Sequence, residues 1–174
     1  TYSYGGGVGI SLENLRPRGA IVNNSAEETT GAVSFMKLYD ATTGLIGQKG
    51  RRGALMISLP INHPDIEEFI DVKLDLNEIT KANISLMVDD EFFKAYMNDI
   101  PYKLSFYVEE TNQSIEKVIN PRKLLRKIAE NNWNMAEPGM LFWDRVEEWH
   151  LLSENPNFKY DSTNPCGEVP LPSY

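Results

Sequence analysis

Short apolar segments alternate with helical patterns along the middle of the chain, and this alternation limits the fold more than any other feature. Residues 54–61, ALMISLPI, and residues 82–88, ANISLMV, have the length and apolar character of buried strands. A helix is expected after each one, over residues 63–73, where Pro64 marks the first turn, and over residues 89–98. Strands that alternate with helices indicate an α/β fold, with a sheet or part of a barrel.

Other segments extend this pattern towards both ends of the chain. Residues 32–47 place apolar side chains at helical spacing, and residues 102–119 alternate around a polar centre, as a hairpin does. A basic amphipathic helix over residues 121–133, a strand over 139–144, a short helix over 145–152 and an extended tail complete the expected order. No repeat or domain boundary is evident, so residues 1–174 are treated as one unit.

Composition narrows the class of protein. The 174 residues suffice for one domain, and they contain no apolar run of the roughly 18 to 20 residues that a membrane span needs. The net charge of −8 argues against broad nucleic-acid binding, which needs a basic surface. A single cysteine excludes an intrachain disulfide and favours a cytoplasmic location. The chain does not begin with Met, and we expect it to be a fragment of a longer protein.

That cysteine lies in the C-terminal segment STNPCGEVPLPSY, between an amide and a carboxylate. Asn164 precedes Cys166 by two residues, and Glu168 follows it by two. In an extended segment these three side chains share one face, and Pro165 and Gly167 share the other. A thiol, a hydrogen-bonding amide and a proton-transfer carboxylate would then project into one small volume. The alternative is an ordinary turn with accidental spacing.

Two further segments allow either a ligand or a structural role. The glycines of GGGVG, residues 5–9, allow close backbone approach, but the segment lacks the Lys and Ser/Thr of a P-loop. The loop QKGRRG, residues 48–53, contains three cations, and Arg16 lies in the segment NLRPRG. Arginine side chains suit phosphates and base edges, whereas a solvated cluster of charges is the alternative.

Taken in order, these segments resemble the large catalytic subunit of ribonucleotide reductase. The matching segments are GGGVGISLENLRPRGA, GQKGRRGALMISLPINHPDIEEFIDVK, ANISLMVDDEFF, PGMLFWDRV and NPCGEVPLPSY, and they cover essentially the whole chain. The resemblance implies a ten-stranded α/β barrel of two five-stranded halves, with a loop through the barrel that carries a radical cysteine. This chain would hold about half of that barrel together with the cysteine loop.

The same resemblance implies the reduction of ribonucleotides to 2′-deoxyribonucleotides, for DNA synthesis, by thiyl-radical chemistry. Cys166 would take the 3′ hydrogen from the substrate, Glu168 would act as general base at the 3′-hydroxyl, and Asn164 would hydrogen-bond the substrate. The residues implied to bind the substrate are Gly7, Arg52, Asn164, Pro165 and Gly167.

Allosteric control is implied as well, by a deoxynucleotide or ATP at a dimer interface. Helix 32–47 and the loop before it would form part of that site, and Arg16 would hold an effector phosphate. Some relatives have a second effector-binding arginine where this chain has Asn23. The loop 48–53 would relay the identity of the effector to the substrate base, through Gln48, Lys49 and Arg51, with Arg52 reaching towards the base.

The residues that flank the cysteine also indicate a radical source. NPCGE and the following PLPSY resemble the adenosylcobalamin-dependent class, and a radical from a separate di-metal subunit is the alternative. The family's reducing cysteines are absent from this chain, and a thioredoxin-type reductant would act through them. We therefore expect the isolated fragment to be inactive and the full protein to be a homodimer, with no nucleic-acid or membrane partner.

Two other functions stay open. A regulatory module that binds nucleotides without chemistry would use Arg16, the loop 48–53 and the helix 32–47. A hydrolase with a cysteine nucleophile would need a base such as His63 or His150, and no pattern places either beside Cys166. The two histidines are far apart in the sequence and neither CxxC nor HExxH occurs, so no metal site is predicted.

Overall fold

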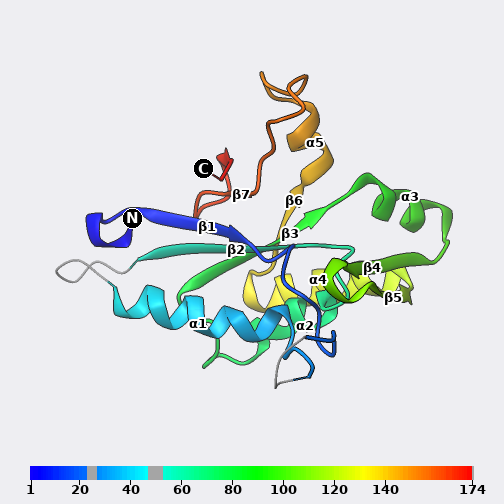
Figure 1. Ribbon diagram of the computed structural model, residues 1–174, viewed down its shortest axis with the longest axis horizontal. Helices are drawn as coiled ribbons and strands as arrows, with labels where there is room; N and C mark the ends of the chain where they lie inside the picture. The colour runs from blue at the N-terminus through cyan, green and yellow to red at the C-terminus, as the bar shows by residue number, and fades with distance from the viewer. Residues whose placement is uncertain (23–26, 47–52, 174) are drawn as a thin grey trace.

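A parallel sheet of four strands organises the chain in the computed structural model, which describes residues 1–22, 27–46 and 53–173 (Figure 1). The strands are β1 (Gly7–Ser11), β2 (Ala54–Pro60), β3 (Ala82–Val88) and β6 (Gly139–Phe142), in the order β1-β2-β3-β6. Among the described residues this sheet has one strand fewer than the five in each half of the barrel that the resemblance implies. The expected α/β class is confirmed.

Helices connect each strand of this sheet to the next, as parallel pairing requires. β1 leads through α1 (Ala32–Leu45) to β2, and β2 leads through α2 (Ile66–Asp71) and a 3₁₀ turn (Val72–Leu74) to β3. The last connection contains α3 (Asp90–Asn98), the antiparallel pair β4 (Tyr102–Val108) and β5 (Gln113–Ile119), and α4 (Pro121–Met135). Short 3₁₀ turns also lie at Tyr2–Tyr4 and Glu109–Thr111.

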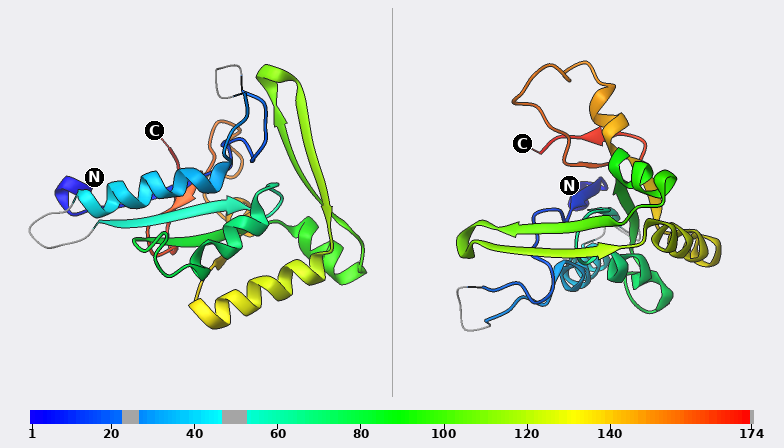
Figure 2. Two further views of the ribbon diagram at one scale, coloured as in Figure 1. Left: turned by 90° about the horizontal axis from the view of Figure 1, so that it is seen from below. Right: turned by 90° about the vertical axis from the view of Figure 1, so that its right-hand side faces the viewer.

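Different segments of the chain cover the two faces of the sheet. In Figures 1 and 2, α1, α2 and α4 lie on one side, and the C-terminal segment lies on the other. That segment contains α5 (Trp143–Glu148) and the short antiparallel strands β7 (Ser162–Thr163) and β8 (Pro170–Leu171). Helices on one face of a parallel sheet and a loop on the other are what part of an α/β barrel requires.

Alternation along the strands divides the side chains between these two faces. The triplet Ile-Ser-Leu begins at residues 10, 57 and 84, and the Ile and Ser of its three copies lie side by side in β1, β2 and β3. The buried isoleucines and leucines of β2 and β3 belong to the core, which they share with side chains such as Met36 of α1, Phe69 of α2 and Ile128 of α4. Each such buried side chain contributes about 1.5–3 kcal/mol to folding. The serines face the C-terminal segment.

Most expected elements are confirmed, and their boundaries differ slightly. The helix expected over residues 63–73 begins at Ile66, because residues 63–65 form a turn, and it ends as the 3₁₀ turn. Helix α1 buries Val33 and Met36, whereas Leu38 and Leu45 are exposed and lie outside its buried stripe. In the part of the chain that is described, no helix has the length and apolar character to cross a membrane.

Candidate functional site

Cys166 lies at the tip of the β7–β8 hairpin, and its side chain is exposed. The turn is closed by backbone bonds, from the Asn164 N–H to the Val169 carbonyl at 2.9 Å and from the Gly167 N–H to the Asn164 carbonyl at 3.0 Å. Gly167 has a φ of +84°, a conformation that favours glycine. The prediction that this segment is extended is therefore wrong, because the chain reverses its direction within six residues.

The turn gives the three polar side chains different environments. The Asn164 side-chain oxygen accepts the Val169 N–H at 3.0 Å, so the oxygen of this amide stabilises the turn. No described residue accepts a hydrogen bond from the Asn164 Nδ2, which is free to donate to a ligand. Glu168 is exposed, as Cys166 is. A thiol, a carboxylate and an amide donor thus stand within five residues of one turn, without the alternation of a strand.

Glycines of β1 allow the hairpin to lie directly on the sheet. A β-carbon at Gly9 would lie 1.6 Å from the Thr163 carbonyl oxygen, and one at Gly7 would lie 2.2 Å from the Pro165 Cγ. Real β-carbons do not approach so closely, so any larger residue at these positions would displace the hairpin. The close packing that the glycine segment allowed is confirmed at both positions.

Polar side chains of β2 and β3 form hydrogen bonds with the hairpin. The hydroxyl groups of Ser58 and Ser162 share a hydrogen bond at 3.4 Å. The Asn83 side chain donates from its Nδ2 to the Pro165 carbonyl oxygen at 2.9 Å. Sequence reasoning passed over Asn83, although an amide side chain within a mostly apolar strand was a signal that a group on that face pairs with it.

Similarity to known proteins identifies the family. The family model described as "Ribonucleotide reductase, barrel domain" matches residues 1–174. The chain belongs to this family. The resemblance carried by the five motifs is therefore confirmed, and so is the assignment of the fold to part of the α/β barrel of ribonucleotide reductases.

Three relatives show how much of their own length this chain matches. A vitamin B12-dependent ribonucleoside-diphosphate reductase of Thermoplasma acidophilum is 41% identical over 172 residues, which are 98% of this chain and 22% of the relative. A protein of the same name from Mycobacterium tuberculosis is 33% identical over 172 residues, which are 98% of this chain and 24% of the relative. The ribonucleoside-diphosphate reductase subunit alpha of Bacillus subtilis is 30% identical over an alignment of 192 residues, gaps included, which covers 95% of this chain and 27% of the relative. The chain spans about a quarter of the length of these relatives.

Arg16 lies away from the cysteine hairpin of this reductase barrel. Its guanidinium group forms an ion pair with Glu110 at 2.9 Å and donates to the Ile21 carbonyl at 3.2 Å. The pKa of Glu110 is lowered, first by a backbone hydrogen bond and then by the charge of Arg16. A cavity of about 320 Å³ adjoins this pair and is lined by the end of β4. The other residues implied in effector and base recognition, Gln48, Lys49, Arg51 and Arg52, lie outside the described residues. Asn23, where some relatives have an effector-binding arginine, lies outside them as well.

Neither histidine contacts Cys166. His63 is 2% exposed, lies 3.0 Å from the Leu15 carbonyl through Nε2, and accepts the Asp65 N–H at Nδ1. Burial lowers the pKa of His63, and this pair of contacts suits the neutral ring. His150 packs against Phe158 and Tyr160 instead. The hydrolase alternative therefore has no histidine base at its nucleophile.

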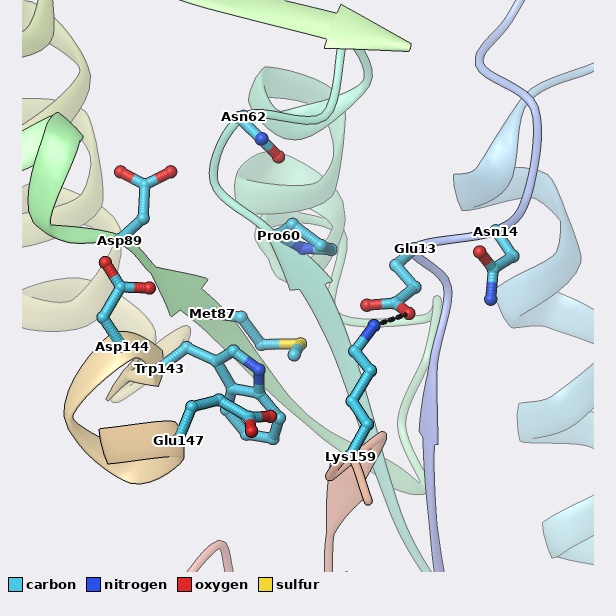
Figure 3. A pocket seen from close by; sticks show the side chains of 10 residues that line it. All are labelled: Glu13, Asn14, Pro60, Asn62, Met87, Asp89, Trp143, Asp144, Glu147 and Lys159. Carbon is cyan, nitrogen blue, oxygen red and sulfur yellow. Dashed lines mark hydrogen bonds and ion pairs between the residues drawn. The ribbon is translucent and has the colours of Figure 1, made fainter. Parts of the chain in front are cut away.

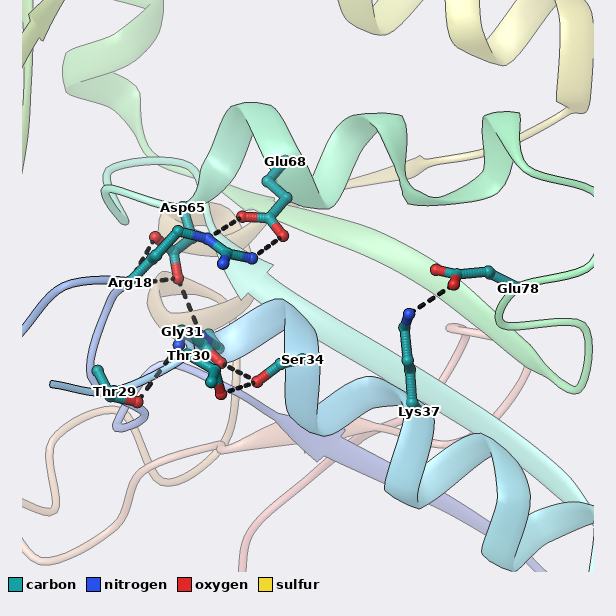
Figure 4. A network of polar contacts seen from close by, with 10 residues as sticks. Arg18, Thr29, Thr30, Gly31, Ser34, Lys37, Asp65, Glu68 and Glu78 are labelled. Atoms are coloured by element: carbon teal, nitrogen blue, oxygen red, sulfur yellow. Dashed lines mark hydrogen bonds and ion pairs between the residues drawn. The ribbon is translucent and has the colours of Figure 1, made fainter. Parts of the chain in front are cut away.

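Asp65 joins three segments of the chain beside the first turn of α1 (Figure 4). Its carboxylate accepts the backbone N–H groups of Arg18, at 3.0 and 3.1 Å, and of Ala32, at 2.9 Å. The Arg18 side chain continues the network to Glu68 at 2.6 Å. This carboxylate occupies the helix N-terminus, where an anion is favourable. It holds the loop that carries Arg16 against α1 and α2.

A larger cavity, of about 570 Å³, lies at the carboxyl ends of the strands of the main sheet (Figure 3). Ligands of open α/β sheets bind at this edge. Three of its acidic side chains already have partners, because Glu13 pairs with Lys159 at 2.9 Å, Asp89 accepts the Tyr102 hydroxyl at 2.6 Å, and Asp144 accepts the Asp90 N–H at 2.8 Å. The fourth, Glu147, has a buried Oε1 that forms no hydrogen bond with the described residues, and its Oε2 lies 4.0 Å from the His150 Nε2. Residues 164–168 do not line it, so the cysteine site is separate.

Proposed function

We propose that this chain is part of the catalytic barrel of a ribonucleotide reductase, and that Cys166 is the residue at which its radical chemistry takes place. The observation that carries the proposal is the exposed thiol at the tip of a hairpin that lies on the face of the parallel sheet opposite α1, α2 and α4. The family and the names of the relatives support the same reaction.

The side chains of the turn suit the successive parts of this reaction. As a thiyl radical, Cys166 takes the hydrogen atom from C3′ of the ribose, so that an S–H bond forms and a C–H bond breaks. Glu168 accepts the proton of the 3′-hydroxyl, and Asn164 donates its free Nδ2 to the substrate. Replacement of the 2′-hydroxyl by hydrogen releases water and needs two electrons and two protons, which a dithiol outside this chain provides as it becomes a disulfide. Cys166 returns its hydrogen atom to C3′ and is again a thiyl radical. A thioredoxin-type reductant then restores the dithiol.

We propose adenosylcobalamin as the radical source, since several relatives are named vitamin B12-dependent. When bound, it supplies the radical that removes a hydrogen atom from a thiol. Cys166 fits such a group, because its side chain is exposed. The alternative is a separate di-metal subunit.

Regulation and assembly belong to the same proposal. Helix α1 and the residue that follows it expose four large apolar side chains, namely Phe35, Leu38, Leu45 and Ile46. Such exposure on one helix supports burial against a second copy of the protein, and therefore a homodimer. Arg16 beside its cavity would hold a phosphate of the deoxynucleotide or ATP effector, in exchange for Glu110. A cytoplasmic location suits this reaction.

The full-length parent protein tests the proposal. Reduction of CDP and CTP is measured with and without adenosylcobalamin, for the native protein and for Cys166→Ser. We expect the native protein to reduce these nucleotides only with the cobalamin, and Cys166→Ser to reduce neither of them. The dissociation constant of the effector in the serine variant should stay within about twofold of the native value. Activity that needs an added metal-radical subunit would retain the role of Cys166 and change the cofactor. Effector binding without reduction under either condition would favour the regulatory module.

A further inference from the structure

Residues 164–168 must be held in two separate ways for Cys166 to act at a defined place. Hydrogen bonds within the turn determine its shape, and they include the closing bonds of Asn164 with Val169 and Gly167. They do not determine where the turn lies over the sheet. Its location depends on contacts between the hairpin and the strands beneath it.

Most of those contacts have little directional preference. Gly7 and Gly9 of β1 limit how closely the hairpin approaches, and Gly167 lies over Met56 of β2 and Leu141 of β6. Packing of this kind resists compression, but it allows the turn to slide or to tilt. Among the described residues, the turn 164–168 has one side-chain hydrogen bond to the main sheet, from Asn83 to Pro165.

That hydrogen bond acts on the peptide group next to the thiol. The Pro165 carbonyl belongs to the planar unit that also contains the Cys166 nitrogen and Cα. Proline has no N–H, so this residue offers only its carbonyl to the sheet. A donor at 2.9 Å therefore determines the orientation of the plane from which the Cys166 side chain projects.

The donor itself stands on a rigid part of the fold. Strand β3 lies between β2 and β6, and Ala82 and Ile84, on either side of Asn83, are buried in the core. Met56 of β2 is the register partner of Asn83, and Gly9 of β1 is the register partner of Met56. The three residues thus form one row across the sheet beneath the hairpin.

We propose that Asn83 is a positioning residue for Cys166: its amide holds the Pro165–Cys166 peptide plane and so sets the place and direction of the thiol. This inference rests on the proposed function of Cys166. Asn83 does not contact the reacting atoms. Its amide is exposed, so its loss should affect the global stability little and the orientation of the turn strongly.

The test compares Asn83→Leu with Asn98→Leu in the full-length parent protein. Asn98 is a matched control, because it is also exposed and donates from its Nδ2 to a backbone carbonyl, that of Lys94, at 2.8 Å. The readouts are kcat and KM for nucleotide reduction, the midpoint of thermal unfolding, and the rate at which iodoacetamide alkylates Cys166, measured on the peptide that contains it.

For Asn83→Leu we expect kcat to fall about 10- to 100-fold, because a displaced reacting group slows the chemical step. KM should stay within about twofold of the native value, since substrate binding is retained. The alkylation rate of Cys166 should change, and the unfolding midpoint should match that of Asn98→Leu. If Asn83→Leu unfolds, Asn83→Ala repeats the test without adding apolar surface.

Native kcat and native alkylation in the Asn83 variant would overturn the inference, and so would equal losses in the Asn98 variant. The alkylation rate also separates this inference from the proposed function. If the native protein does not reduce nucleotides, the proposed function fails, and an alkylation rate that differs between the Asn83 and Asn98 variants still supports the contact with Pro165.

Discussion

Gly9 of β1 lies against the carbonyl group of Thr163 in β7, and a β-carbon at residue 9 would stand 1.6 Å from that oxygen. The two residues are far apart in the sequence, yet their backbones touch. At this point the hairpin that carries Cys166 therefore rests directly on the backbone of β1. This contact determines the distance between the cysteine turn and the sheet.

Gly9→Ala should displace the hairpin and destabilise the full-length protein by about 1–3 kcal/mol, because the added methyl group has no space. The measurement is the free energy of unfolding in urea. Gly6→Ala is the control, since the closest atom to its β-carbon would be the Thr1 side-chain Cγ2, at 2.7 Å, which can rotate away, and the backbone atoms of Thr1 would lie at ordinary contact distances of 3.5 and 3.9 Å. Equal stability of the two variants would contradict the close contact.

His63 should make stability depend on pH. Burial lowers its pKa in the folded protein, and the unfolded value is about 6.5. Above that pH both states are neutral and the full stability is present. As the pH falls below about 6.5 the unfolded state binds the proton first, so stability decreases until the pH reaches the folded pKa.

Urea unfolding of the full-length protein between pH 7.5 and pH 5 measures this dependence, and we expect a slope of at most about 1.4 kcal/mol per pH unit from this group. The matched variants are His63→Gln and His150→Gln. The first should remove this part of the slope, and the second should retain it. A slope that survives His63→Gln would assign the effect to other groups.

Asp65→Asn should destabilise the protein by about 1–3 kcal/mol, because an amide has one acceptor oxygen where the carboxylate has two. The second position would present an NH₂ group to a backbone N–H of Arg18 or Ala32. Thermal unfolding of the full-length protein measures the loss. Asp75→Asn is the control, since Asp75 accepts the Asn77 N–H at an exposed turn. A native midpoint for Asp65→Asn would show that the network contributes nothing.

Leu38→Glu should weaken the proposed dimer, because it places a charge in the apolar surface of α1. Leu38 is 62% exposed in the single chain, so the folded subunit tolerates the change. Sedimentation of the full-length protein at several concentrations measures the dissociation constant, and we expect it to rise at least about tenfold. Met97→Glu, at a residue of α3 that is 74% exposed, should leave it unchanged. A dimer unaffected by Leu38→Glu would exclude this face of α1.

Much of the fold followed from local patterns. The apolar runs at 54–61 and 82–88 are β2 and β3, and the alternation over 102–119 is the β4–β5 hairpin. The predicted extended conformation of the C-terminal segment is wrong. Asn164, Cys166 and Glu168 would share one face only in an extended chain. Gly167 with its positive φ and the bond from the Val169 N–H to Asn164 close a turn there instead.

The sequence by itself determined the order of the strands and helices and the family, because hydrophobic periodicity and the motifs around Cys166 are local properties of the chain. Only the tertiary structure decided that Gly9 meets Thr163 and that Asn83 meets Pro165. Those contacts join residues more than 80 positions apart. They depend on strand register and on the path of the hairpin across the sheet, which no local pattern contains.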